Sequence, residues 1–451
     1  MSTGSSAERL QAFREAAAKT KGFQCITALF DEGTFNEVDG FAKSGDGSAE
    51  VVAGYGEVDG CPAYAFVQNS DVDGGAMSKA QAAKIKKIYD LAVKTGSPVV
   101  GIYDSIGGRL NQGADMLAAY GEILLGNNNL SGVVPQISLV LGPCLGTSAM
   151  IAASADIVVM TKKAQLTIDT TGKDGTAEDA AKLGICHVVA KDDQEAMMQV
   201  RKLLAVLPSN NLAGAPVFES SDPSDTAITA GADTKKIVEA ISDKGSFMEL
   251  NGAFGTSAVT GLTQIGGSTV GVTALNGVLD VDSCSKAARF VRFCDAFSIP
   301  VVTLVDAKEF TSVREASKLS NAYSEATTAK ITVITGEAYG PVYVAIAGRG
   351  ANADYTMAWA NAVVCPLAPQ TAAMFLWSDR LKKSGNTKEA RNKLIEEYKA
   401  TEATPFAAAA EGFIEDIIDP AETRAKVIAN LEMLEGKRVS RLPKKHSNIQ
   451  I

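Results

Sequence analysis

Hydrophobic and polar positions follow two different spacings that alternate along the chain. Residues 63–67, 99–103 and 137–141 are short apolar runs bounded by polar or turn-forming residues, a pattern typical of buried strands. Residues 79–95 instead place apolar side chains three and four positions apart, which is typical of an amphipathic helix. Strands that alternate with helices predict an α/β fold in which both faces of the sheet are covered.

This pattern occurs twice in the chain. Residues 31–35 recur as residues 243–247, residues 84–104 align with 286–306, and residues 135–146 align with 329–340. A repeat unit of about 200 residues is far too long for a solenoid and indicates two copies of one domain. We therefore predict an N-terminal domain, 1–215, and a C-terminal domain, 216–451, with the boundary in the proline-containing segment 208–216.

Composition narrows the class of function. The chain has 451 residues, 46% of them hydrophobic, and a net charge of −9, which is typical of a globular protein and gives no general attraction for nucleic acid. Seven scattered cysteines without a CxxC pair, together with only two histidines, give no pattern for a metal site or a histidine-based triad. The scattered thiols and the lack of a leader pattern at the N-terminus predict a cytoplasmic protein.

The uncharged segment 123–155 is long enough to span a bilayer. Asparagine, proline and glycine break it into short pieces, so we expect a buried strand, turn and helix there and no membrane span. In residues 137–155 an apolar strand leads through a glycine-containing turn into small residues typical of a closely packed helix.

The start of this small-residue helix is the first candidate site. The first N–H groups of a helix have no partner within it, so we expect those of Gly146 and Thr147 to be free. Such donors stabilise negative charge on a thioester oxygen. The alternative is purely structural, because small residues also allow a helix to pack closely against a sheet.

The second copy repeats this construction. Residues 331–335 form an apolar strand, residues 336–340 a turn, and Pro341 stands where a helix would begin. Proline lacks an N–H and is also favoured at a first helical position for structural reasons. The expected donors in this copy are therefore Gly340 and Val342.

Two further loops lie at the predicted carboxyl ends of strands, where ligands enter open α/β sheets. One contains Gly74, Gly75 and Ala76, and the other contains Gly107, Gly108 and Arg109. Both are candidates to bind the nucleotide tail of a substrate. For Arg109 the alternative is an ion-paired surface residue.

The sequence resembles the carboxyltransferase subunit of biotin-dependent acyl-CoA carboxylases and decarboxylases, of the methylmalonyl-CoA decarboxylase alpha and propionyl-CoA carboxylase beta type. The resemblance covers nearly the whole chain and is strongest in the segments 29–35, 52–60, 84–104, 132–144, 207–211, 286–297, 323–340 and 443–449. It implies two duplicated crotonase-like domains, a homotrimer or homohexamer, and a site between the first domain of one subunit and the second domain of another.

The resemblance also implies a chemistry. An acyl-CoA, either methylmalonyl-CoA/propionyl-CoA or malonyl-CoA/acetyl-CoA, would lie against Gly146 and Thr147, and biotin against Gly340 and Val342, with enolates held by backbone N–H groups. The chain has no Met-Lys-Met biotin-attachment sequence, so biotin would arrive on a separate carrier protein. A biotin carboxylase or a membrane decarboxylase subunit would be a further partner, and the latter would place the protein at a membrane surface.

Departures from the family pattern leave other functions open. Its Cys-Ala-Gly-Gly-Ala becomes residues 144–148, Cys-Leu-Gly-Thr-Ser, and its Ala-Tyr-Gly-Gly-Ala becomes residues 338–342, Ala-Tyr-Gly-Pro-Val. One alternative is a scaffold or CoA-binding subunit without activity. Another is a biotin-independent crotonase-type hydratase or hydrolase, which needs a carboxylate beside the first turn, and Glu178 is the nearby candidate. The acyl group and the direction of the reaction stay open.

Overall fold

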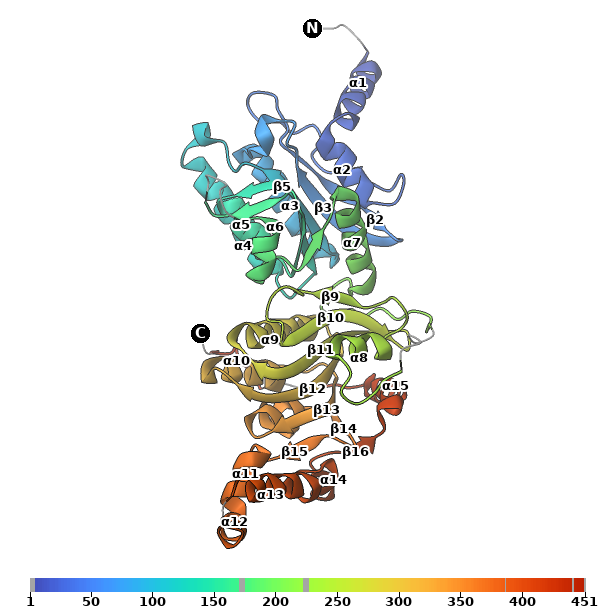
Figure 1. Cartoon of the computed structure of the whole chain (residues 1–451). Helices are drawn as coiled ribbons and strands as arrows, with labels where there is room; N and C mark the ends of the chain where they lie inside the picture. Colours follow the sequence, from blue (N-terminus) through green and yellow to red (C-terminus); the bar gives the residue numbers. More distant parts are fainter. Residues whose placement is uncertain (1–4, 170–174, 222–226, 386, 440–441, 450–451) are drawn as a thin grey trace. The chain divides into compact units, whose positions relative to one another are not determined.

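The computed structural model describes residues 5–169, 175–221, 227–385, 387–439 and 442–449 (Figure 1). The chain divides into two compact units, Met1–Ala213 and Gly214–Ile451, and the division falls within the segment 208–216. Each unit contains one mixed β-sheet with helices packed against it. The predicted α/β class is confirmed.

The elements of the first unit are, in chain order, α1 (Ser6–Ala18), α2 (Lys21–Leu29), β1 (Asn36–Glu37), β2 (Val51–Val58), β3 (Cys61–Gln68), η1 (Asp73–Gly75), α3 (Lys79–Thr95), β4 (Val99–Ser105), η2 (Leu110–Gln112), α4 (Asp115–Leu130), β5 (Gln136–Leu145), α5 (Thr147–Ala153), β6 (Ile157–Thr161), β7 (Gln165–Thr167), α6 (Ala177–Lys182), β8 (Val188–Ala190) and α7 (Asp193–Val206). The strand order is β1-β2-β3-β4-β5-β6-β8, and β7 pairs with the end of β5. The pairs β1–β2 and β2–β3 are antiparallel, and the remaining pairs are parallel.

The second unit contains α8 (Thr234–Ile241), β9 (Met248–Leu250), β10 (Ala258–Ile265), β11 (Ser268–Leu279), α9 (Val281–Ala296), β12 (Val301–Phe310), α10 (Val313–Glu325), β13 (Lys330–Tyr339), η3 (Tyr343–Ala347), η4 (Arg349–Ala351), β14 (Tyr355–Trp359), β15 (Val363–Cys365), α11 (Pro369–Leu376), α12 (Ser378–Lys383), α13 (Lys388–Thr401), α14 (Pro405–Ala410), β16 (Asp416–Ile418), η5 (Pro420–Glu422) and α15 (Thr423–Leu434). Its strand order, β9-β10-β11-β12-β13-β14-β16 with β15 on β13, repeats that of the first unit. The repeat seen in the sequence is therefore a repeat of topology.

The periodicity located the main elements correctly. Helix α3 spans the residues predicted, and β3, β4 and β5 contain the three predicted apolar runs. Helix α3 begins where the Ser78 side chain accepts a hydrogen bond from the Gln81 N–H, and it ends at Gly96, whose φ of 65° is left-handed. A hydroxyl at the N-cap and glycine at the C-terminus are common helix boundaries.

An aspartate holds the β2–β3 hairpin of the first unit. Asp59 and Gly60 both have positive φ, as in a type I′ turn. Their N–H groups donate to the Asp31 carboxylate at 3.2 and 2.9 Å, and the Arg201 guanidinium of α7 pairs with Asp31 at 2.8 Å. These bonds hold the pKa of Asp31 below its ordinary value, with the Arg201 hydrogen bond as the largest cause.

The β10–β11 hairpin of the second unit is held in the same way. Gly266 and Gly267 have positive φ, and both N–H groups donate to the Asp243 carboxylate at 2.9 Å. Arg424 of α15 pairs with the same carboxylate. The duplication thus extends from strand order to individual hydrogen bonds.

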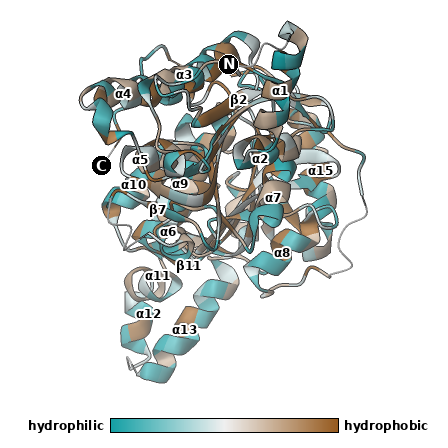
Figure 2. Ribbon diagram, turned by 90° about the horizontal axis from the view of Figure 1, so that it is seen from above, coloured by the Kyte–Doolittle hydropathy of each residue, from teal (hydrophilic) through white to brown (hydrophobic). Residues whose placement is uncertain are grey.

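The helices of the first unit divide between the two faces of its sheet. Val140 belongs to the same buried apolar cluster as residues of α3, α4, α5 and α6. The next residue, Leu141, lines a pocket with side chains of α2 and α7. Because successive side chains of a strand point to opposite faces, α5 and α6 share the face of α3 and α4, and α2 and α7 cover the other. In Figure 2, α8 and α13 of the second unit carry both polar residues, in teal, and hydrophobic residues, in brown.

The uncharged segment 123–155 forms the end of α4, strand β5 and helix α5, as expected for a buried strand, turn and helix. Within the described residues, no helix combines the length and the apolar character that crossing a bilayer requires.

Candidate functional site

A glycine bend connects β5 to the first candidate turn. A Cβ on Gly142 would lie 2.1 Å from Oδ1 of Asp104 on the neighbouring strand β4, so a side chain here would require the Asp104 carboxylate to move. Gly146 has a φ of 63°, and α5 begins at the next residue, Thr147. Glycine at these two positions lets β5 pass the Asp104 carboxylate and turn at once into the helix.

The predicted donor set of this turn is partly wrong. The Gly146 N–H is not free, because it donates to the Thr167 carbonyl oxygen at 2.9 Å. Strand β7 pairs alongside the end of β5 and brings Thr167 opposite Leu145, so the sheet uses this donor. The N–H groups of Thr147 and Ser148 occupy the first two positions of α5 and have no partner within the helix. They are the candidate donors of the first turn.

The second candidate turn, around Gly340, also differs from its prediction. The Gly340 N–H donates to the Cys365 carbonyl oxygen of β15 at 3.0 Å and is not free. Pro341 has no N–H, and the expected regular helix is instead the short π-helical segment η3, which begins at Tyr343. The N–H of Val342 remains a candidate donor, together with that of Tyr343. A Cβ on Gly336 would lie 2.2 Å from Oδ1 of Asp306, as at the corresponding bend of the first unit.

The first predicted substrate loop is a tight turn. The Gly75 N–H donates to the Val72 carbonyl at 2.8 Å, and the Ala76 N–H donates to the Asp73 carbonyl at 3.1 Å. Gly74 and Gly75 both have positive φ, and a Cβ on Gly75 would lie 2.3 Å from a backbone oxygen of β4. The glycines therefore let this turn lie directly against the carboxyl end of β4.

The structure joins this loop to the second one. The Met77 N–H donates to the Gly107 carbonyl at 2.9 Å, and the Arg109 N–H donates to the Met77 carbonyl at 2.9 Å. The Ser105 hydroxyl donates to the Gly75 carbonyl at 2.7 Å and accepts the Gly107 N–H at 3.0 Å. The loops with Gly74, Gly75 and Ala76 and with Gly107, Gly108 and Arg109 thus form one ordered rim.

The Arg109 side chain is part of the interior of this rim. It is 7% exposed and pairs with Glu50, which is 0% exposed, at 2.5 Å, with Asp73 at 2.9 Å, and also with Asp46. An arginine that neutralises a buried carboxylate cannot leave it for a phosphate without a large electrostatic cost. Arg109 is ion-paired, as the alternative expected, but it is buried and not at the surface, and we assign it no contact with the nucleotide tail.

Sequence reasoning missed a charged group near the bend at Gly142. The Lys21 ammonium pairs with Asp104 Oδ2 at 2.5 Å, and the Ser70 hydroxyl donates to the same oxygen at 2.7 Å. The hydrogen bond to Asp104 is the largest cause that raises the pKa of Lys21. Lys21 and Asp104 are 83 positions apart, so no local pattern indicates the pair.

Sequence reasoning also missed Tyr120 of α4. Its hydroxyl lies 3.2 Å from the Ser148 hydroxyl, in the first turn of α5. Ser148 is 1% exposed, and burial raises the pKa of Tyr120 above its ordinary value. A tyrosine within a helix is usually a core residue, so only the tertiary contact distinguishes it.

A cavity of about 790 Å³ lies beside α5 and is lined by residues of α5, β7 and α6. Asp179, not the proposed Glu178, contributes the carboxylate of its lining, and the Thr176 hydroxyl donates to that carboxylate at 2.7 Å. In the second unit a cavity of about 700 Å³ is lined by the end of β12, by α10 and by Pro341. The first cavity thus lies along α5, without Gly146, Thr147 or Ser148 in its lining, whereas the second cavity includes Pro341 of the second turn.

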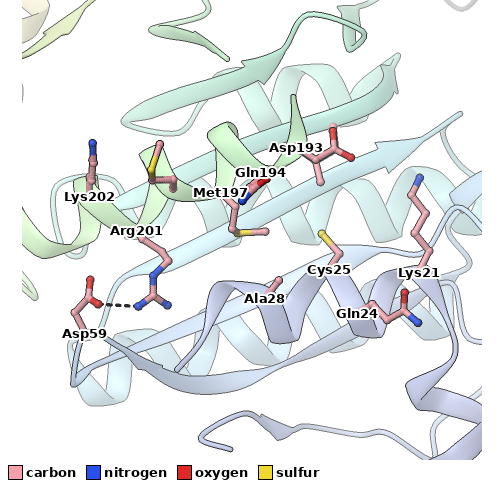
Figure 3. A pocket seen from close by; sticks show the side chains of 12 residues that line it. Lys21, Gln24, Cys25, Ala28, Asp59, Asp193, Gln194, Met197, Arg201 and Lys202 are labelled. Atoms are coloured by element: carbon pink, nitrogen blue, oxygen red, sulfur yellow. Dashed lines mark hydrogen bonds and ion pairs between the residues drawn. The ribbon is translucent and has the colours of Figure 1, made fainter. Parts of the chain in front are cut away.

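Another pocket of about 700 Å³ lies between α2 and α7, on the opposite face of the first sheet from α5 (Figure 3). Met197 and Cys25 line its middle, and charged groups lie toward its ends. Arg201 is paired with Asp59 at 2.7 Å, and Lys21 with Asp104. This pocket is therefore separate from the candidate turn.

Comparison with known proteins identifies relatives over nearly the whole chain. The carboxyl transferase domain family matches residues 16–449. The alpha subunit of methylmalonyl-CoA decarboxylase from Veillonella parvula is 36% identical, with 97% of this chain and 94% of that subunit covered. The propionyl-CoA carboxylase beta chain of Saccharopolyspora erythraea is 36% identical, with 98% and 93% covered. The 12S subunit of methylmalonyl-CoA carboxyltransferase from Propionibacterium freudenreichii subsp. shermanii is 35% identical, with 98% and 93% covered.

Solved structures give the same result for the fold. A crystal structure of transcarboxylase 12S, described as a hexamer assembly with methylmalonyl-coenzyme A and methylmalonic acid bound, matches with a TM-score of 0.88 and 33% identity. The match covers 99% of this chain and 97% of that chain. Together with the two related sheets, it confirms the predicted duplicated fold.

Proposed function

Because the chain belongs to the carboxyl transferase family, we propose that it moves a carboxyl group between a short-chain acyl-CoA and biotin on a separate carrier protein. The observation that carries this proposal is the duplicated strand–glycine–helix turn, in a chain whose relatives match over nearly their full length. The relatives' names favour the pair methylmalonyl-CoA and propionyl-CoA, with malonyl-CoA and acetyl-CoA as the second choice.

In the first unit we assign the acyl-CoA to the turn at the start of α5. A thioester that gains or loses a carboxyl group at its α-carbon passes through an enolate, with negative charge on the thioester oxygen. The N–H groups of Thr147 and Ser148 are the donors available there, and one such donor contributes about 3–4 kcal/mol to transition-state stabilisation. The backbone of the rim around Gly74, Gly75, Ala76, Gly107 and Gly108 would position the CoA portion.

In the second unit we assign biotin to the turn after Gly340. Biotin carries the carboxyl group that is transferred. The cavity beside Pro341 is lined by Ser317, Ser320 and Asn321 of α10, whose hydroxyl and amide groups suit the hydrogen-bonding needs of a ureido ring. The N–H groups of Val342 and Tyr343 are the donors that would face a developing negative charge there.

We further propose a homotrimer or homohexamer, a form supported by the hexamer described for transcarboxylase 12S. Met374, Phe375 and Leu376 are consecutive exposed apolar residues on α11, as expected of a surface that another protein covers. The other partners would be a biotin carrier and either a biotin carboxylase or a membrane decarboxylase subunit. The proposed location is the cytoplasm, at a membrane surface if the partner is the decarboxylase.

The test measures loss of the carboxyl group from methylmalonyl-CoA and malonyl-CoA by the purified chain, with and without free biotin. We expect biotin-dependent turnover with at least one of them. Turnover that is absent for every short acyl-CoA tested, with free biotin and with a biotinylated carrier domain, contradicts the proposal. Loss of the carboxyl group that does not need biotin also contradicts the proposal. Release of free CoA from the thioester, or hydration of an enoyl-CoA, would instead support the hydrolase or hydratase alternative.

An inactive scaffold is the second candidate, favoured by the second turn. There the Gly340 N–H is used by Cys365 and Pro341 has none, so the second turn lacks a donor at the position that matches Thr147. Pro341→Gly adds an N–H at the position that matches Thr147. An inactive wild type that gains biotin-dependent turnover through this substitution would show that the second turn had lost its function, whereas an active wild type excludes the scaffold.

A further inference from the structure

The hydroxyl groups of Tyr120 and Ser148 connect α4 to the first turn of α5. Their oxygens are 3.2 Å apart, and the Ser148 side chain is almost completely buried. Ser148 is the second residue of α5, and its own backbone N–H is one of the two candidate donors. At the matching position the second unit has Val342, which has no hydroxyl group.

The Tyr120 ring also lies against the rim. A Cβ on Gly108 would lie 3.0 Å from Cε2 of Tyr120 and 3.5 Å from its hydroxyl oxygen. Gly108 lies between the two residues whose backbones hydrogen-bond to Met77. The Tyr120 phenol therefore lies between the rim proposed to hold CoA, next to Gly108, and the turn proposed to hold the thioester oxygen, at Ser148.

From this geometry we propose that Tyr120 is a positioning residue for carboxyl transfer, which acts through the Ser148 hydroxyl. It sets the distance between the first turn of α5 and the rim at Gly108. This inference rests on the proposed function. The rim would still bind CoA without the hydroxyl pair, but the N–H groups of α5 would be less well aligned with the charge that develops in the transition state.

The experiment is a double-mutant cycle with Tyr120→Phe, Ser148→Ala and the double variant. For each we measure kcat and KM for the acyl-CoA in biotin-dependent decarboxylation. We expect Tyr120→Phe to lower kcat by about tenfold, with KM changed by less than about twofold, because the lost bond matters in the transition state. Ser148→Ala should lower kcat to a similar extent, and the double variant should lose little more, because both substitutions break the same bond.

Tyr323→Phe is the matched control. It removes a tyrosine hydroxyl that lies 3.0 Å from the Thr303 hydroxyl in the second unit, where both residues are buried. We expect it to lower the melting temperature about as much as Tyr120→Phe but to leave kcat and KM at wild-type values. If both variants lower kcat equally, or the losses from Tyr120→Phe and Ser148→Ala add, the positioning role is wrong.

The two proposals fail in different ways. A wild-type protein without biotin-dependent turnover overturns the proposed function. An active wild type whose kcat is unchanged by Tyr120→Phe overturns only the role of Tyr120.

Discussion

Replacing Thr147 with proline tests the proposed chemistry by removing a single backbone N–H group. The substitution removes one N–H donor from the start of α5 and leaves that of Ser148. Proline is well tolerated at a first helical position, where its missing N–H breaks no bond within the helix. The chain itself shows that this backbone accepts it, because Pro341 follows Gly340, φ 54°, as Thr147 follows Gly146, φ 63°.

The expected magnitude follows from the number of donors. If Thr147 and Ser148 share the charge on the thioester oxygen, loss of one donor raises the barrier by about 3–4 kcal/mol and lowers kcat by about 100- to 1000-fold. The free energy of unfolding should change by less than about 1 kcal/mol, since Thr147 is exposed and no bond within α5 is lost.

The assay compares kcat for biotin-dependent decarboxylation in wild type, Thr147→Pro and Thr147→Ala. The alanine variant keeps the N–H and removes only the side chain, so its kcat should stay within about twofold of wild type. A proline variant that keeps more than half of the wild-type kcat would refute the assignment of the charge to this turn. So would a complex with a CoA thioester analogue whose carbonyl oxygen lies beyond hydrogen-bonding distance of both N–H groups.

Three predictions concern stability. Arg109→Gln leaves the buried Glu50 carboxylate without its cation and should lower the free energy of unfolding by about 3–5 kcal/mol in urea denaturation, and a loss below about 1 kcal/mol would contradict the ion-pair role. Gly142→Ala places a Cβ against the Asp104 carboxylate and should cost about 1–3 kcal/mol by the same measurement, so a variant as stable as wild type argues against this close approach. Burial lowers the pKa of Lys286 to about 8, so between pH 8 and pH 10 the unfolded chain holds a proton that the folded chain has released. Stability of the wild type relative to Lys286→Met should therefore rise by about 2 kcal/mol over this interval, and a flat or falling difference would contradict the shifted pKa.

Local patterns in the sequence were sufficient to predict the fold class, the repeat and the main elements. The apolar spacing of residues 79–95 matches α3, because a helix that buries one face needs that spacing whatever it packs against. The two copies of the domain can be recognised in the sequence because both preserve the same strands, bends and hairpins. The two candidate turns were also visible, since glycine marks positions where the backbone must pass close to another chain segment.

The partners of individual polar groups were decided only by the tertiary structure. The Gly146 N–H is used by Thr167, which β7 brings back alongside β5, and the Arg109 guanidinium is used by carboxylates far away in the sequence. The contact between Tyr120 and Ser148 depends on how α4 packs against α5. Periodicity specifies which face of an element is buried, but it carries no information on which distant donor and acceptor will meet there. The sequence by itself therefore determined where the two turns lie, and the order of strands and packing of helices determined which of their N–H groups remain free for chemistry.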